Sequence, residues 1–345
     1  MFLLACCDKI DIAKSGKELY ELFKRKAPKM SGVDAISELE KVMIGDIEQW
    51  IYLRGENCHH PILLMLHGGP GTGQIGFMRK FQQQLEKNFV VVQWDQRGSG
   101  LSYSKNIPLE SMNIDQFVHD TIKITEYILK RLNQKKLYLV AHSWGTIIGM
   151  LAISRAPQLF YRYFGISQVV HVAENETFSY THVLEKAKRE NHEKAYKELL
   201  KIGPPPWDDL KYDRVHQKYV EAFGGGITRD GKMVNKILLS LLTSKEYTLL
   251  DCFRYFKGVY FSLNSLQAEM RKVDLNEQVD RIELPIYFLM GKYDLTAPYE
   301  PTKDFFERID APEKQWILFE NSAHTPSLEE PDKFREIIMK ETNRD

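Results

Sequence analysis

The chain has 345 residues, and 43% of them are hydrophobic, which is enough to build the core of one large domain or of a domain with an insert. Its 47 basic residues balance its 47 acidic residues, so the composition gives no case for a nucleic-acid partner or an acidic membrane surface, and we expect neither. The four cysteines lack the paired spacing of a zinc site and the density of a disulfide scaffold, so we expect free thiols and no bound metal.

The amino terminus is apolar only over Met1 to Cys7, which is too short for a signal peptide or a membrane-spanning helix. We therefore predict a cytoplasmic protein without membrane association. Leu3-Leu4-Ala5-Cys6 resembles a bacterial lipoprotein cleavage site, however, so a start upstream of Met1 would instead predict a lipid anchor at the cell surface. Residues 1–45 are expected to form a surface leader with one short helix around Glu18 to Lys26.

Buried strands and helices alternate from residue 46 onward. Continuous apolar runs predict strands that are covered on both faces, and apolar residues at helical spacing predict helices between them. The strands are expected at 50–54, 62–66, 89–94, 137–141 and 164–170, and the helices at 77–87 and 114–132. This alternation predicts a mostly parallel, doubly wound α/β sheet, whose ligand sites lie at the carboxyl ends of the strands.

The pattern changes after residue 171. Residues 172–271 read as charged, amphipathic helices separated by Gly203-Pro204-Pro205-Pro206 and Gly224-Gly225-Gly226, which predicts a helical cap inserted into the sheet domain. The sheet pattern resumes with strands at 284–290 and 315–319 and helices at 299–309 and 331–342. The core is therefore expected to comprise residues 46–171 and 272–345.

Ser143 follows a predicted buried strand and precedes a predicted helix. A serine at such a sharp strand-to-helix turn has an exposed hydroxyl and a strained backbone, and the residues two before and two after it must be small. Ala141 and Gly145 meet that requirement. This segment is therefore predicted to be a nucleophile elbow.

Asp294 and His324 also follow predicted strands, so they are expected at the same edge of the sheet as Ser143. A serine hydroxyl needs a base, and the base needs a third group that orients it. The chain order Ser143, Asp294, His324 is the order found in α/β-hydrolases. We expect His142 to serve in packing or substrate contact, and Asp95 to form a structural ion pair with Arg97.

Three motifs together resemble the proline iminopeptidase branch of the α/β-hydrolase superfamily. They are the His67-Gly68-Gly69-Pro70-Gly71 loop, the Asp95-Gln96-Arg97-Gly98-Ser99-Gly100-Leu101-Ser102 loop and the Ser143-Trp144-Gly145 turn. The resemblance implies an α/β-hydrolase fold and a serine hydrolase without a cofactor. It also implies an oxyanion hole formed by the backbone N–H groups of Gly69 and Trp144.

The substrate that this family implies is a small peptide or amide with a free amino-terminal residue, preferably proline. Family members use glutamates of the cap to hold the substrate's amino terminus, and the candidates here are Glu174, Glu176 and Glu221. The family's elbow usually reads Gly-Gly-Ser-Trp-Gly, whereas this chain has Ala141-His142 before the serine. Two alternatives stay open, namely an esterase or lactonase that acts on small esters with the same triad, and a non-catalytic binding protein.

Overall fold

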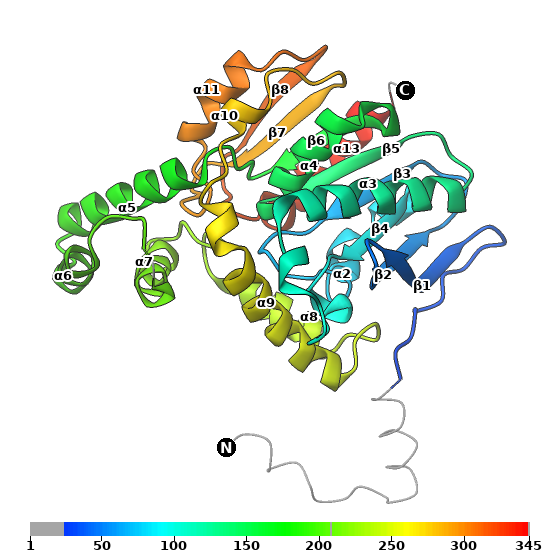
Figure 1. The fold of residues 1–345 in the computed structure, drawn as a ribbon, viewed down its shortest axis with the longest axis horizontal. Coiled ribbons are helices and arrows are strands. Elements are labelled where there is room, and N and C mark those ends of the chain that lie inside the picture. The colour runs from blue at the N-terminus through cyan, green and yellow to red at the C-terminus, as the bar shows by residue number, and fades with distance from the viewer. Residues whose placement is uncertain (1–23, 208, 344–345) are drawn as a thin grey trace, which may run out of the picture.

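The computed structural model describes residues 24–207 and 209–343, and it contains a single eight-stranded sheet (Figure 1). The strand order is β1-β2-β4-β3-β5-β6-β7-β8. The β1–β2 and β2–β4 pairs are antiparallel, and all the other pairs are parallel, so the predicted mostly parallel sheet is confirmed. The strands are β1 Ile36–Ile44, β2 Ile47–Gly55, β3 Ile62–Leu66, β4 Val90–Asp95, β5 Leu137–His142, β6 Phe160–Ile166, β7 Ile286–Gly291 and β8 Lys314–Phe319.

The central strands are rich in apolar residues because helices cover both faces of the sheet. Every residue of β3 and β4 is buried. One face packs against α3 Ile114–Arg131, α4 Trp144–Arg155 and α11 Glu300–Arg308, and the other packs against α13 Pro331–Thr342. Burial on both faces fixes the positions of the loops at the strand ends.

The prediction of a surface leader as far as residue 45 is wrong for residues 36–44, which form β1. Ile36, Val42 and Ile44 are buried, whereas Glu38 and Lys41 between them are exposed and Glu40 is partly exposed, as is typical of an edge strand. These charges lowered the hydrophobic signal of the segment. Most of the helix expected around Glu18 to Lys26 lies outside the described residues, and Lys24 to Lys26 are not helical.

Two other predicted elements also differ from the structure. The helix expected over 77–87 is two short pieces, α2 Arg79–Gln82 and the 3-10 turn η1 Leu85–Lys87. The strand β6 ends at Ile166, four residues before its predicted end. The remaining short elements are η2 Gly100–Ser102, η3 Leu109–Ser111, η4 Pro157–Leu159, α10 Leu275–Gln278 and α12 Pro326–Glu329.

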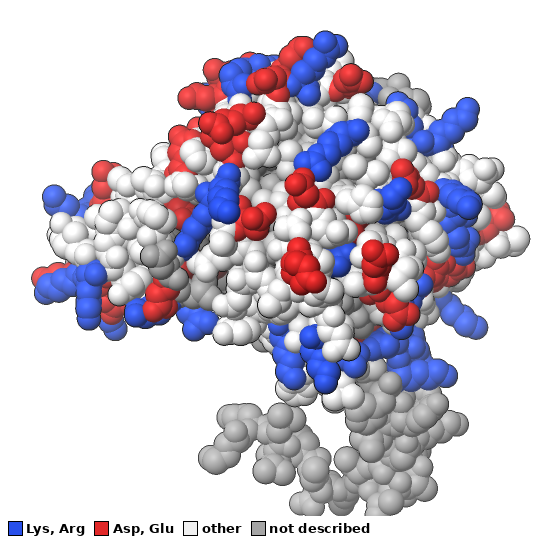
Figure 2. Space-filling model, viewed as in Figure 1, with Lys and Arg blue, Asp and Glu red and all other residues white. Residues whose placement is uncertain are grey.

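Between β6 and β7, we refer to residues 172–271 as the cap, and its described residues form five helices. They are α5 Val172–Arg189, α6 Glu193–Ile202, α7 Leu210–Ala222, α8 Lys232–Leu242 and α9 Leu249–Met270. In Figure 1, α5, α6 and α7 stand out to one side of the sheet, whereas α8 and α9 lie beside α2. Within the described part of the chain, no helix is both long and apolar enough to cross a bilayer. Figure 2 shows acidic and basic side chains interspersed over the viewed face, in keeping with their equal numbers.

Candidate active site

Ser143 lies at the turn between β5 and α4 with φ 53° and ψ −121°, a conformation that non-glycine residues adopt only under constraint. A Cβ atom at Gly145 would lie 2.7 Å from the carbonyl oxygen of Leu66, so strand and helix approach too closely for a larger residue. The local geometry is therefore that of the predicted elbow, and it places Ser143 at the amino end of α4.

Asp294 and His324 meet at the carboxyl ends of β7 and β8. Asp294 Oδ2 lies 2.8 Å from His324 Nδ1, and its Oδ1 accepts from the backbone N–H groups of Thr296 and Ala297, each at 2.8 Å. Because a carboxylate only accepts, Nδ1 carries the proton and Nε2 is left as an acceptor. Ser143 and His324 line one cavity, so the structure brings together the three residues that the sequence singled out.

The glycine loop after β3 borders the same cavity through Gly69. Gly69 has φ 115°, and a Cβ atom there would lie 2.8 Å from the backbone nitrogen of Gly71. His67 anchors the loop, since its Nδ1 donates to Gly68 O at 2.8 Å and its Nε2 accepts from Gln96 N at 3.1 Å. Burial lowers the pKa of His67 to about 4, which keeps the ring neutral.

Gln96 joins this loop to the elbow. Its side-chain amide donates to His67 O at 3.0 Å, and its Oε1 accepts from Trp144 Nε1 at 3.1 Å. The backbone of the cap helix α9 comes within reach of the glycine loops as well. A Cβ atom at Gly258 would lie 2.8 Å from Gly98 O, and one at Gly71 would lie 2.9 Å from Val259 Cα. Hydrogen bonds and close contacts therefore fix the loops around Ser143.

His142 is partly buried and packs against His324, with 4.9 Å between the ring centroids. Its Nε2 donates to the backbone carbonyl of His324 at 2.8 Å. Desolvation and the neighbouring His324 lower the pKa of His142 to about 3. The ring is neutral and donates its proton to a carbonyl, so we interpret His142 as a packing residue, one of the two roles expected from the sequence. His142 also lines the cavity.

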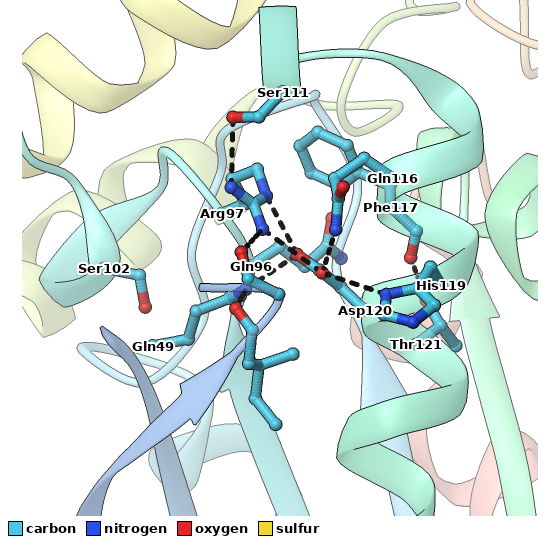
Figure 3. Close-up of polar contacts among 12 residues, drawn as sticks. Gln49, Gln96, Arg97, Ser102, Ser111, Gln116, Phe117, His119, Asp120 and Thr121 are labelled. Carbon is cyan, nitrogen blue, oxygen red and sulfur yellow. Dashed lines mark hydrogen bonds and ion pairs between the residues drawn. The ribbon is translucent and has the colours of Figure 1, made fainter. Parts of the chain in front are cut away.

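The expected ion pair between Asp95 and Arg97 is wrong. Arg97 Nε bonds to Asp120 Oδ2 of α3 at 2.9 Å, and Figure 3 shows the guanidinium enclosed by Asp120, Ser111 and the β1–β2 turn. Asp95 instead accepts from the backbone of Ile75 and Leu101 and from the Tyr247 hydroxyl of the cap. Burial raises the pKa of Asp95 to about 6. Adjacency in sequence was misleading because the two side chains have entirely different partners.

A cavity of about 520 Å³ lies between the sheet edge and the cap. Ser143, His324 and Gly69 lie on its core side, and residues of α5, α7 and α9 line its cap side. Among the cap residues are two acids, Glu176 of α5 and Asp213 of α7, whose pKa values are raised by burial. This is the size and composition of a site for a small organic molecule.

Glu176 is the one cap glutamate of the predicted three that lines the cavity. Glu174 is exposed, 3.5 Å from His171, and Glu221 accepts from the backbone N–H of Ile227 at 2.9 Å. Within the described residues, Glu176 Oε2 and both amide atoms of the neighbouring Asn175 are buried without a hydrogen-bond partner. These atoms are therefore available to a ligand.

Sequence reasoning missed Asp213 and Asn175. The helical spacing of α5 carried a usable signal. Glu176, next to Asn175, precedes Tyr180 and Val183 by four and seven residues and so lies on the buried face of α5. Asp213 stands likewise three residues before the buried His216. An acid on the buried face of an amphipathic helix is unusual enough to mark a site. No group of metal-ligating side chains was found among the residues that the structure describes.

Known proteins resemble this chain over most of its length. A family model described as alpha/beta hydrolase fold matches residues 61–194. The chain is 39% identical over 311 residues to the protein named probable aminopeptidase YbaC from Bacillus subtilis (strain 168), covering 89% of this chain and 96% of the relative. It is 24% identical over 298 residues to the proline iminopeptidase of Clostridioides difficile (strain 630), covering 81% of this chain and 89% of that protein.

A solved structure shows the same fold. The proline iminopeptidase-related protein TTHA1809 from Thermus thermophilus has a TM-score of 0.64 and 20% identity, covering 88% of this chain and 96% of the other. The sequence motifs, the sheet topology and these relatives agree. The chain is therefore a hydrolase that belongs to the α/β-hydrolase family, in its proline iminopeptidase branch.

Proposed function

We propose that the protein is a serine aminopeptidase that releases an amino-terminal residue, preferably proline, from small peptides. The observation that carries the proposal is the joint placement of Ser143, His324 and two acidic cap residues around one cavity. Ser143 and His324 supply the acyl-transfer chemistry. The two carboxyl groups can bind a positively charged amino terminus, which explains the preference for a free one. The names of the relatives support this class of substrate.

In the proposed reaction, Ser143 Oγ attacks the carbonyl carbon of the first peptide bond while His324 Nε2 takes the hydroxyl proton. Asp294 keeps the proton of His324 on Nδ1 and stabilises the imidazolium. The tetrahedral intermediate collapses as His324 gives its proton to the leaving amine. Water then attacks the acyl-enzyme with His324 again as the base, which releases the amino acid and restores Ser143.

We assign the oxyanion hole to the backbone N–H groups of Gly69 and Trp144. Trp144 begins α4, where the backbone N–H groups have no partner within the helix and the helix dipole favours negative charge. Gly69 lines the cavity beside Ser143. One such donor is typically worth about 10²–10³ in rate.

The substrate's ammonium group is assigned to Glu176 and Asp213. Both carboxyls have pKa values raised chiefly by burial, with Arg271 acting in the opposite direction. A bound ammonium would stabilise the charged forms of both carboxyls, which would offset the cost of their burial. An acylated amino terminus would lose this interaction, and the charge of Arg271 alone would then act on both acids.

Hydrolysis of arylamides tests the proposal. We expect turnover of prolyl-arylamide by the wild-type protein, weaker turnover of alanyl-arylamide, and none when the amino group is blocked or when Ser143 is replaced by alanine. Turnover of a short-chain aryl ester alone would discard the peptidase assignment in favour of an esterase. Failure of a fluorophosphonate to label Ser143 in folded protein would favour a non-catalytic role.

A further inference from the structure

A second polar pair stands one helical turn beyond the two cap acids. Ser179 follows Glu176 by three residues on α5, and His216 follows Asp213 by three residues on α7. Both are 2% exposed, both line the cavity, and Ser179 Oγ lies 3.1 Å from His216 Nε2. The same two helix faces therefore carry the acids and a buried serine–histidine pair.

The direction of each hydrogen bond in this pair follows from its partners. Ser179 Oγ donates to the backbone carbonyl of Leu295, because a carbonyl oxygen only accepts. The hydroxyl has one proton, so it must accept from His216, whose proton is therefore on Nε2. Burial lowers the pKa of His216 to about 4, which keeps this tautomer neutral. Ser179 is thus held in place and has no base, so it is not a second nucleophile.

The carbonyl that Ser179 binds belongs to the residue after Asp294. Leu295 is held from the cap on its other side too, because its backbone N–H donates to Gly225 O at 2.8 Å. Gly225 lies three residues after the end of α7, and a Cβ atom there would lie 2.5 Å from the Leu295 side chain. The N–H of His324 donates to the next cap residue, Gly226, at 3.2 Å. The cap therefore contacts the backbone beside both Asp294 and His324.

We propose that Ser179 and His216 of the cap are positioning residues that hold Asp294 in place for its hydrogen bond to His324. The inference rests on the proposed function, because it assigns a task to Asp294. The pair acts through the Leu295 carbonyl and makes no bond to the substrate. One consequence is that α5 and α7 both bind the amino terminus and align the catalytic base, so the same pair of helices serves substrate binding and catalysis.

The test compares three variants with a matched control. Ser179→Ala and His216→Leu remove the pair, His216→Gln keeps an N–H donor at a similar reach, and Thr181→Ala removes an exposed hydroxyl of α5. For each protein we would measure kcat and KM on prolyl-arylamide and the rate at which a fluorophosphonate labels Ser143. The labelling rate reports on the triad without using the amine subsite.

We expect Ser179→Ala and His216→Leu to lower both kcat and the labelling rate by about 3- to 10-fold, the range of one neutral hydrogen bond, with KM changed less than about twofold. His216→Gln should recover most of the rate, and Thr181→Ala should match the wild type. Rates are taken per folded molecule, from circular dichroism. Wild-type labelling rates in both variants, an effect on KM alone, or no recovery in His216→Gln would overturn the proposal. Wild-type protein that Ser143 labelling does not inactivate would instead refute the proposed function.

Discussion

His142 and Ala141 are the two residues at which this chain departs from its family's elbow, and the contacts of His142 give a role to the larger side chain at its position. Its Nε2 donates to the carbonyl of His324, which also accepts from Ser167 Oγ at 3.1 Å. The backbone of the proposed base is thus fixed from the elbow as well as from the cap. A glycine at position 142 would remove the stronger of these two contacts.

We predict that His142→Gly lowers kcat for prolyl-arylamide roughly fivefold, because a buried hydrogen bond of this kind is worth about 1 kcal/mol. His142→Gln serves as the control, since its amide N–H reaches a similar position. Steady-state kinetics on both variants provides the measurement. Equal activity of the glycine variant and the wild type would mean that His324 is held without His142.

The two cap acids are predicted to affect binding of the free amino terminus only. Glu176→Gln and Asp213→Asn should each raise KM for prolyl-arylamide about 10-fold or more, the value of one charge-assisted hydrogen bond, and leave aryl ester hydrolysis unchanged. Glu174→Gln is the matched control, because that side chain is exposed on the same helix. A parallel loss on amide and ester would show that these acids serve folding or general catalysis.

At this scale the sequence predicted the elbow and the chain order of the triad, because each residue follows a recognisable strand. The proposed roles of the three residues stay a prediction until they are tested. The Ser179–His216 pair could not be predicted from the sequence. It depends on which face of α5 meets α7 and on the position of the Leu295 carbonyl. Neither fact is written in local sequence.

Among the elements, α3 is tied to the loop after β4 by one buried ion pair. Arg97 and Asp120 have side chains 1% and 0% exposed, and Gln49 Nε2 of β2 also bonds to Asp120 Oδ2 at 2.7 Å (Figure 3). The guanidinium donates further to Gly45 O in the β1–β2 turn at 2.7 Å. This cluster joins the antiparallel edge of the sheet to the loop that supports the oxyanion site.

We expect Asp120→Ala to lower the free energy of unfolding by about 3–5 kcal/mol, because it leaves Arg97 buried without a counter-charge. Replacing both residues by apolar ones should cost less than the single change. Urea unfolding followed by tryptophan fluorescence gives the values. A loss below about 1 kcal/mol in Asp120→Ala would indicate that water reaches the guanidinium.

The central strands and long helices were predicted well because burial on both faces leaves an apolar run or a clear helical period. The edge strand β1 was missed because its outward residues are charged, and such charges protect a sheet edge from unwanted pairing. The helix expected over 77–87 broke into α2 and η1 because its pattern was weak and no side chain caps either piece. Tertiary contacts decide the structure in such segments.

Across the whole molecule, three histidines are held neutral: the buried His67 and His216 and the partly buried His142, with pKa values lowered to about 4, 4 and 3, chiefly by desolvation. In the unfolded chain each would titrate near 6.5. Between that value and the folded pKa the unfolded state binds more protons, so the stability these groups contribute is present above about pH 6.5 and is lost as the pH falls. The raised pKa of Asp95 acts in the opposite direction.

A single substitution isolates this effect from the other titrating groups. We predict that the loss of unfolding free energy between pH 7 and pH 5 is smaller in His142→Gln than in the wild type by about 2 kcal/mol. Urea unfolding of both proteins at the two pH values gives the difference, in which unaffected groups cancel. Identical pH dependence would show that the pKa of His142 is not lowered by folding.

Where the cap helix α9 crosses the loop at Gly98, it contacts that loop through residues with almost no side chain. Gly258 lies over Gly98, and Ser262 Oγ donates to Gly98 O at 3.2 Å, so the helix backbone is almost in contact with the loops beside Ser143. A chimera that carried the cap of another hydrolase would therefore need glycine and a serine-sized residue at these two positions. With bulkier residues at these positions, the helix of the transplanted cap would pack farther from the core. A cap exchange that was meant to alter specificity would then remove the support of the oxyanion loop.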